Sequence, residues 1–388
     1  MCKFKLRNFL KRFLNKIARE LIYLLTKIEK NKVLLIQESY SGSNTLALYR
    51  LYNHSFSNKT KVVLFKDSAK YSGLKSYYNK HRLIGSSDII LTTHASYKAS
   101  NKQRHFQLWH GGFVKKNGVF EKGHKGNKVV SPWKGVDFVL SYSETYTTFM
   151  NSCMLLKPEK YIVTGAPRND FLLQADGNFN LSKIFGSKVL DSKIIFYLPT
   201  FKEYQYAEGD NSFKYNPFGF EKFLTEDFDH FLTGKNSKII FKPHPHEEGL
   251  ALDFVKLSNF KNILVLKESD LENHDLDLYE LINGSQILIT DYSSIFYDYL
   301  LLQRPIIFSI PDIVKYNEYR GFLVESFEDW APGPKVYSQF ELQQEIEKSL
   351  RDGGYYSEKR TQLMRLQHRY FDANSSKRVW SFVNSILK

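Results

Sequence analysis

His110 is the residue whose position in the sequence most directly suggests chemistry. It follows the apolar run HFQLW and precedes Gly111 and Gly112, so its imidazole should project from a turn that a ligand can approach closely. A neutral imidazole in that place could accept the proton of an attacking hydroxyl group. The alternative is a buried histidine that is hydrogen-bonded only to the backbone. His110 is therefore a candidate general base, with the structural role still open at this point.

Hydroxyl groups gather in the segment TDYSS, which comes just before the expected helix IFYDYLLL. Ser293 and Ser294 would lie beside free backbone N–H groups at the start of that helix, where phosphate oxygens bind readily. Asp and Ser are also preferred helix N-caps, so capping is the alternative interpretation.

Two histidines, His244 and His246, alternate with prolines in the segment KPHPHE. The extended backbone of such a segment would place both side chains on one side. Two histidines without a third placed ligand are weak evidence for a metal, and we predict no metal site here. A phosphate contact, or protonation of a leaving group, suits His244 better.

Basic side chains near glycine and proline form a further set of candidates. Arg168 and Arg320 could bind a phosphate or carboxylate group through two parallel hydrogen bonds, or could be ordinary surface charges. A basic loop after His110 could guide an anionic acceptor or simply remain solvated. Its lysines are Lys115, Lys116, Lys122 and Lys125.

These candidates follow short apolar runs, and those runs alternate with longer amphipathic stretches. The runs are VLLIQ, KVVLFK, DIILTT, HFQLW, DFVLSY, YIVTG, KIIFYLP, KIIFKP, NILVL, QILIT and PIIFSI. Strands separated by helices predict parallel sheets in an α/β protein. Ligands of such sheets bind beyond the carboxyl ends of the strands, which is where the candidates fall. We therefore predict two doubly wound, Rossmann-like domains that face a common cleft.

The least periodic interval, near residues 174–190, marks the expected domain boundary. The predicted division is a helix at residues 1–30, one domain at 31–180, a second at 181–345 and C-terminal helices at 346–388. Within the first segment, apolar residues recur every three or four positions from Leu6 to Ile28, with cations largely between them. This pattern predicts a basic amphipathic helix that lies on a membrane surface, the alternative being a helix packed on the protein's own core.

Composition narrows the class of protein. The 388 residues carry a formal net charge of +14, which favours anionic partners such as phospholipid headgroups or phosphorylated substrates. The cations are not interleaved with aromatic residues in a recognisable RNA-binding motif, so we expect no nucleic acid partner. Cys2 and Cys153 are too few for a disulfide framework, and no apolar run is long enough to span a bilayer.

Taken in order, the motifs resemble the CDP-glycerol glycerophosphotransferase family, the TagB/TagF-like enzymes of teichoic acid and capsule synthesis. The resemblance rests on LWHGGFVKKNG, TGAPRND, YLPTFKE, KPHP, LITDYSSIFYDYLLLQRPIIF, YRGF and PGP, and it covers roughly residues 32 to 345. Each motif alone is weak, whereas the ordered series is specific. One departure is Gly112, because family members often carry threonine after the first glycine.

The resemblance implies a glycosyltransferase-B-like fold and a transfer that needs no metal or cofactor. The first domain would then bind the acceptor and the second the CDP-activated donor. His110 would be the general base, and His244 would contact phosphate. The implied donor contacts are Pro199, Thr200, Lys242, Thr290, Asp291, Ser293, Ser294 and Arg320. The implied acceptor or phosphate contacts are Gly111, Gly112, Arg168, Asn169 and Asp170.

The expected partners are CDP-glycerol or CDP-ribitol, a lipid-linked or polymeric acceptor, and an anionic membrane at the cytoplasmic face. Three alternatives remain from sequence: a ribitol phosphate transferase, a glycosyltransferase that uses a nucleotide sugar, and a basic peripheral protein without activity. Priming and polymerising enzymes are equally compatible with the motifs.

Overall fold

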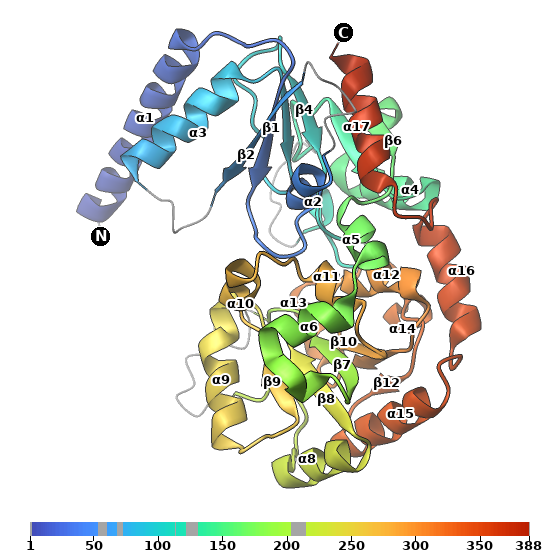
Figure 1. Ribbon diagram of the computed structural model, residues 1–388. Coiled ribbons are helices and arrows are strands. Elements are labelled where there is room, and N and C mark those ends of the chain that lie inside the picture. The colour runs from blue at the N-terminus through green and yellow to red at the C-terminus, as the bar shows by residue number, and fades with distance from the viewer. Residues whose placement is uncertain are drawn as a thin grey trace.

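Two parallel β-sheets, each at the centre of an α/β domain, make up the computed structural model (Figure 1). The backbone is described for residues 2–52, 60–67, 73–112, 114–121, 131–202 and 215–387, and side chains are described within these ranges from residue 13 onward. The two domains lie one above the other in Figure 1.

The first sheet has the strand order β2-β1-β3-β4-β5-β6. Its strands are β1 (Lys32–Gln37), β2 (Lys61–Lys66), β3 (Ile89–Thr92), β4 (Arg104–Gln107), β5 (Phe138–Ser141) and β6 (Tyr161–Val163). Every residue of β1 is buried, as expected for a central strand of a parallel sheet that helices cover on both faces. The strand order reverses between β1 and β3, and ligands of open α/β sheets bind at such a point.

The second sheet has the order β12-β11-β10-β7-β8-β9. Its strands are β7 (Lys193–Leu198), β8 (Ser237–Phe241), β9 (Ile263–Val265), β10 (Ile287–Thr290), β11 (Ile306–Ser309) and β12 (Lys335–Val336). Here the order reverses between β7 and β10, which are hydrogen-bonded neighbours. The loops that leave these two strands are therefore the expected ligand-binding loops of this domain.

Helices cover both sheets. Those of the first domain are α1 (Cys2–Leu25), α2 (Asn44–Arg50), α3 (Leu74–Ser86), α4 (Glu144–Met154) and α17 (Ser375–Ile386). The second domain contains α8 (Thr225–Gly234), α9 (Glu248–Leu257), α10 (Glu268–Asn273), α11 (Tyr279–Ile282), α12 (Ile295–Tyr299), α13 (Ile313–Tyr319), α14 (Phe327–Trp330) and α15 (Gln339–Arg351). The linking helices are α5 (Arg168–Gln174), α6 (Gly177–Phe185) and α16 (Ser357–Gln367). Short 3-10 turns are η3 (Gly118–Phe120), η4 (Pro158–Lys160), η5 (Gly186–Val189), η6 (Pro245–Glu247) and η7 (Leu300–Leu302).

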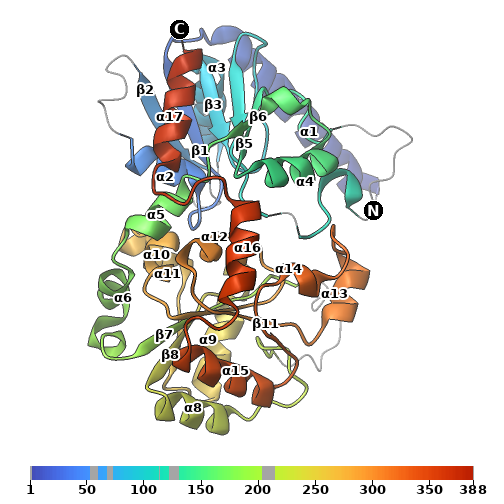
Figure 2. The ribbon, with the colours of Figure 1, turned by 90° about the vertical axis from the view of Figure 1, so that its right-hand side faces the viewer.

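The chain passes between the domains twice. After β6 it runs through α5 and α6, and both helices contact α11 of the second domain. Near the C-terminus, α16 leads back toward the first domain and α17 lies on it (Figure 2). Trp380 of α17 is buried there and donates its indole N–H to the Leu48 carbonyl at 3.0 Å. The segment 346–388 is thus shared between the domains rather than forming a unit of its own.

The predicted fold class is confirmed, and each of the eleven apolar runs forms a strand. The sequence reading missed β12, which has only two residues and therefore no readable periodicity. The predicted N-terminal helix is present as α1. Within the described residues, no helix is both long and apolar enough to cross a membrane.

Candidate active site

A cleft of about 380 Å³ lies where the carboxyl ends of the two sheets meet. The first domain contributes Trp109, His110, Gly111, Gly112, Lys115 and Asn117, and the second contributes Thr200, Phe201, Lys202, Ser294, Tyr316, Tyr319 and Arg320. One set follows β4, and the other follows β7 and β10 or belongs to the segment at the end of α13. The cleft therefore exists only when both domains are in place.

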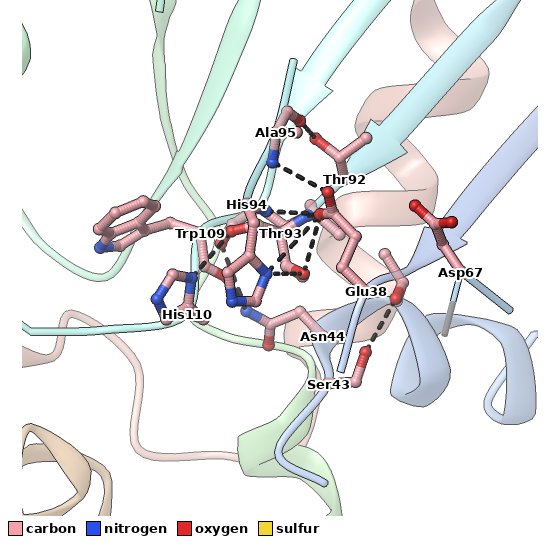
Figure 3. Close-up of polar contacts among 12 residues, drawn as sticks. Glu38, Ser43, Asn44, Asp67, Thr92, Thr93, His94, Ala95, Trp109 and His110 are labelled. Carbon is pink, nitrogen blue, oxygen red and sulfur yellow. Dashed lines mark hydrogen bonds and ion pairs between the residues drawn. The ribbon is translucent and has the colours of Figure 1, made fainter. Parts of the chain in front are cut away.

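His110 is held in a defined tautomer. Its Nδ1 atom lies 2.9 Å from the carbonyl oxygen of Thr93, and because a carbonyl can only accept, Nδ1 carries the hydrogen (Figure 3). Nε2 is then the basic nitrogen. Burial, with a smaller contribution from the neighbouring His94, lowers the pKa of His110 to about 3. The imidazole is neutral at physiological pH and can accept a proton on Nε2.

The backbone before His110 is in an unusual conformation. Trp109 has φ +53°, in the left-handed region that non-glycine residues seldom adopt. Its amide donates to Oε1 of Gln107 at 3.0 Å, and its carbonyl accepts from Nδ2 of Asn44 at 2.9 Å. These bonds fix the turn that follows β4 and directs His110 to the cleft.

Gly112 allows the two domains to approach each other. A Cβ atom at this position would lie 2.3 Å from Cδ2 of Tyr297, and one at Gly111 would lie 3.4 Å from Oγ of Ser294. Tyr297 is buried, so it has little room to move aside. The glycine that departs from the family pattern is therefore matched to close packing against Tyr297, and threonine could not be accommodated without a shift of the domains.

Three cationic side chains line the cleft, and they differ in their partners. Lys202 forms ion pairs with Asp312 at 2.8 Å and with Asp291 at 3.5 Å. Arg320 is paired with Glu121 at 2.7 Å. These two cations are neutralised by nearby carboxylates.

Lys115 differs from the other two cations. Its Nζ lies 3.4 Å from Oγ1 of Thr200, and within the described part of the chain it has no carboxylate partner within 4 Å. Burial is the main cause that lowers the pKa of Lys115 to about 8. Of the three cations named here, Lys115 is therefore the one whose ammonium group is available to bind an anionic ligand.

The residues after β10 divide into those that line the cleft and those that shape it. Ser294 lines the cleft. Asp291 accepts hydrogen bonds from the amides of Thr200 and Ser293, at 2.8 and 3.1 Å, and so ties the loop after β7 to the loop after β10. Thr290 does not line the cleft, and its buried hydroxyl donates to the Leu198 carbonyl at 2.7 Å.

His244 and Lys242 lie behind the cleft. The ring of His244 stacks on Phe201, with centroids 4.6 Å apart, and Phe201 lines the cleft. The His246 amide donates to Nδ1 of His244 at 3.3 Å, which leaves the ring hydrogen on Nε2. Lys242 is buried and forms ion pairs with Glu248 and Glu268, at 3.3 and 3.1 Å. Pro199 begins the loop that leads to Thr200.

The segment that starts α5 lies outside the cleft lining. Arg168, Asn169 and Asp170 are all buried and do not line the cleft. Arg168 forms an ion pair with Asp298 of the second domain at 2.6 Å. Asp170 accepts from the amides of Ser375 and Ser376, at 2.9 and 2.7 Å, and thereby fixes the start of α17. In this structure Arg168 and Asp170 join elements to one another.

The sequence profile of the family described as CDP-Glycerol:Poly(glycerophosphate) glycerophosphotransferase matches residues 19–385. The chain belongs to this family. By that description it is a transferase of glycerol phosphate, and the cleft just described is the place where the family's two domains meet in this chain.

Known proteins of similar sequence agree with this membership. The teichoic acid poly(glycerol phosphate) polymerase of Bacillus spizizenii is 29% identical over 83% of this chain and 85% of its own length. The teichoic acid glycerol-phosphate primase of Bacillus subtilis is 25% identical over 94% of this chain and 92% of its own length. This chain covers only 49% of the length of the teichoic acid poly(glycerol phosphate) polymerase of Staphylococcus epidermidis and 30% of that of Bacillus subtilis.

The fold also matches a solved structure, that of the wall teichoic acid polymerase TagF. The TM-score is 0.73 at 21% identity, over 98% of this chain and 96% of that one. At this identity the comparison concerns the fold alone.

Sequence reasoning gave Lys115 no defined role and did not single out Lys202 or Trp109. Lys115 had been grouped with Lys116, Lys122 and Lys125 as a solvated or acceptor-guiding loop, and the last two lie outside the described residues. Spacing alone could not separate Lys115, which lines the cleft, from the other lysines of this loop. Within the described residues, no group of three His, Cys, Asp or Glu side chains could hold a metal ion.

Proposed function

We propose that this glycerophosphotransferase transfers glycerol phosphate from CDP-glycerol to a hydroxyl group of a lipid-linked or polymeric cell-surface acceptor, in teichoic acid or capsule synthesis. The observation that carries the proposal is that one cleft holds both His110, with a basic Nε2, and Lys115, which has no carboxylate partner among the described residues. A base for the acceptor and a cation for the donor are what such a transfer needs.

The reaction follows from this arrangement. An acceptor hydroxyl oxygen attacks the phosphorus that bears the glycerol, while Nε2 of His110 removes the hydroxyl proton. The new phosphorus–oxygen bond forms as the bond to the bridging diphosphate oxygen breaks, and CMP leaves with the electron pair. Lys115 stabilises the charge that develops on the leaving phosphate, and Ser294 and Thr200 offer hydroxyl groups beside it.

His244 has a supporting role in this proposal. Its ring stacks on Phe201, which lines the cleft, and so holds that side chain in place. Because Nδ1 of His244 accepts a hydrogen bond, the ring hydrogen is on Nε2 and can be donated to a phosphate oxygen. Burial is the main cause that lowers the pKa of His244, so at neutral pH it acts as a hydrogen-bond donor rather than as a cation.

CDP-glycerol is preferred over CDP-ribitol as the donor because the family description and the relatives covered over most of their length name glycerol phosphate. The test is CMP release by purified protein from CDP-glycerol, CDP-ribitol and a panel of nucleotide sugars, with membranes as the source of acceptor. We expect release from CDP-glycerol. Turnover of CDP-ribitol alone would change the polyol, and turnover of a nucleotide sugar alone would overturn the reaction class.

We further propose that α1 binds the enzyme to an anionic membrane surface at the cytoplasmic face. The helix packs on α3 through Tyr23, whose hydroxyl lies 2.8 Å from Nδ1 of His81. Its apolar stripe points away from this contact and is exposed, with Leu24 and Leu25 exposed by 82% and 88%. The other exposed members of the stripe are Phe13, Leu14, Ile17 and Leu21. An outward apolar stripe argues against a helix that uses this face to pack on its own core.

Sedimentation with vesicles that contain phosphatidylglycerol tests the membrane proposal. The double substitution Leu21→Ser and Leu25→Ser should weaken vesicle binding about tenfold, because each partly inserted leucine contributes about 0.7 kcal/mol, roughly half of what full burial contributes. The matched control is Leu252→Ser with Leu257→Ser, which are exposed leucines on α9. Equal binding by both variants would exclude α1 as the anchor.

A further inference from the structure

The turn that follows β3, residues 93–95, is held by a single carboxylate. Glu38, just after β1, accepts hydrogen bonds from the amides of Thr93, His94 and Ala95 at 3.2, 2.7 and 3.0 Å. These residues lie at the point where the strand order of the first sheet reverses. Burial raises the pKa of Glu38, but the hydrogen bonds from His94 and the amides outweigh it and leave the pKa lowered. Glu38 is therefore an anion that orders the turn.

The ordered turn contacts His110 in two ways (Figure 3). The Thr93 carbonyl accepts from Nδ1 of His110, as described above. The ring of His94 stacks on the ring of His110, with centroids 3.9 Å apart and planes inclined by 14°. One contact sets the tautomer of His110, and the other restricts rotation of its ring.

His94 is itself fixed on the far side of this stack. The Thr93 hydroxyl donates to Glu38 at 3.5 Å and so accepts from Nδ1–H of His94 at 2.9 Å. Nδ1 of His94 also lies 3.7 Å from the Glu38 carboxylate. The His94 side chain is 41% exposed and is not part of the cleft lining, so any effect it has on the reaction must pass through His110.

We propose that His94 is a positioning residue whose stacked ring, held by Glu38 and Thr93, keeps His110 oriented with its basic nitrogen toward the acceptor hydroxyl. The inference rests on the role proposed above for His110. A rigidly held base matters because proton removal requires the base within hydrogen-bond reach of the hydroxyl, and a displacement near 1 Å can cost about 100-fold in rate. Without the stack, the contacts left to the His110 ring among the described residues are the bond to Thr93 and the tilted ring of Trp109, whose centroid lies 4.4 Å away.

Two substitutions separate the ring of His94 from its nitrogen atoms. His94→Phe keeps a flat ring for stacking, whereas His94→Ala removes it. We expect His94→Ala to lower kcat for CMP release roughly 10- to 100-fold with a donor KM within about twofold of wild type. His94→Phe should restore kcat to within about threefold. The matched control is His230→Ala, an exposed histidine of α8 far from the cleft, which should leave kcat unchanged.

A second readout does not depend on the identity of the donor. In protein labelled with ¹⁵N-histidine, the ring nitrogens of His110, assigned by their loss in His110→Ala, should show the Nδ1–H tautomer. In His94→Ala the His110 ring, no longer held against rotation, should lose its bond to the Thr93 carbonyl part of the time, so these signals should move toward the average of the two tautomers. In His94→Phe they should stay near the wild-type position.

The outcomes are distinguishable. Wild-type kcat and unchanged His110 signals in His94→Ala would overturn the inference, and so would a His94→Phe variant as impaired as His94→Ala. If wild-type protein released CMP from no CDP-polyol, the proposed function would fail instead, and the His110 signals alone would decide whether His94 positions the ring.

Discussion

Arg168 of the first domain and Asp298 of the second form an ion pair of 2.6 Å whose side chains are only 5% and 1% exposed. The same guanidinium donates to the carbonyl of His110 at 2.7 Å and lies over the ring of Tyr279. Tyr279 also donates to Asp298 at 2.6 Å. The turn that carries His110 is thus linked directly to the pairing of the two domains.

A short backbone pairing adds a second connection beside the cleft. Lys115 and Phe322 form an antiparallel bridge, the Lys116 amide donates to the Gly321 carbonyl at 3.1 Å, and the Leu323 amide donates to the Val114 carbonyl at 2.7 Å. The loop that carries Lys115 is therefore fixed by the second domain. Contacts between the two domains thus bring His110 and Lys115 together, and neither domain does so alone.

The substitution Asp298→Asn tests the importance of the buried pair. It leaves the Arg168 charge buried without a countercharge, which should lower the free energy of unfolding by about 3–5 kcal/mol. It should also lower kcat, because the bond from Arg168 to the His110 carbonyl loses its anchor. Urea denaturation measures the first effect, and CMP release measures the second.

The control for that substitution is Glu347→Gln, which removes an exposed ion pair with Lys235. Exposed pairs contribute little, so its denaturation midpoint should match that of wild type. An Asp298→Asn protein as stable as wild type would show that the pair does not hold the domains.

Lys115 should make donor binding dependent on pH. Because its pKa in the free protein is about 8, it is charged below that pH and loses its charge above it, while the diphosphate of the donor stays ionised. The Kd for CDP-glycerol should therefore increase as the pH rises from 7 to 9.5. In Lys115→Arg the guanidinium stays charged, and the increase should be absent. Parallel curves from isothermal titration calorimetry for the two proteins would rule out this role.

His105 should contribute to acid sensitivity. Its Nε2 donates to the Thr92 hydroxyl, which itself donates to the Ala95 carbonyl, and its Nδ1 is buried without a hydrogen-bond partner among the described residues. Burial lowers the pKa of His105 to about 4, below its value in the unfolded chain. The unfolded chain thus binds more protons, and the stability from this group is lost as the pH falls from about 6.5 to 4.

The substitution His105→Phe checks this assignment. Between pH 7 and 4 its free energy of unfolding should fall by about 2–3 kcal/mol less than that of wild type. His81, whose pKa burial also lowers to about 4, remains in both proteins, so part of the acid sensitivity persists in the variant. Two denaturation curves that shift equally with pH would contradict the role of His105.

Trp109 carries a buried hydrogen-bond donor beside the cleft. Its indole Nε1 is buried and has no hydrogen-bond partner among the described residues, although the side chain lines the cleft. If this N–H meets a ligand oxygen, Trp109→Phe should lower kcat/KM about tenfold, as expected for a lost hydrogen bond to a charged group. The free energy of unfolding of Trp109→Phe should change little. The smaller ring loses packing contacts, but the substitution also removes a buried donor that has no partner among the described residues, and the two effects offset each other.

Trp133→Phe is the matched control, because Trp133 packs edge-to-face against Trp109 with centroids 5.0 Å apart but does not line the cleft. It should lower stability and leave kcat/KM within about threefold of wild type. A larger kinetic loss in Trp133→Phe than in Trp109→Phe would argue against the indole contact.

The fold could be predicted from sequence because each strand of more than two residues is an apolar run between polar turns, and the alternation with helices specifies parallel sheets. The position of His110 could also be predicted, since it follows a strand and precedes glycines. The stack of His94 on His110 could not, because it depends on the hydrogen bonds that Glu38 makes across the sheet.

The partners of charged residues were harder to predict from sequence than the positions of the strands. Arg168 was expected at a ligand, but its partner is Asp298, 130 positions later in the chain. Lys242 was expected at the donor, and two glutamates from later segments neutralise it. A charge in a loop rich in glycine and proline looks the same in sequence whether its partner is a ligand or a distant side chain.

The most direct test of the central claim compares donor binding and turnover in His110→Ala. Calorimetry measures the Kd for CDP-glycerol, and CMP release with membrane acceptor measures kcat. We expect a Kd within about threefold of wild type and a kcat lowered by about 10²- to 10⁴-fold, because the base is lost and the donor cations remain. CMP release by His110→Ala at the wild-type rate would show that His110 is not the base and would contradict the proposed mechanism.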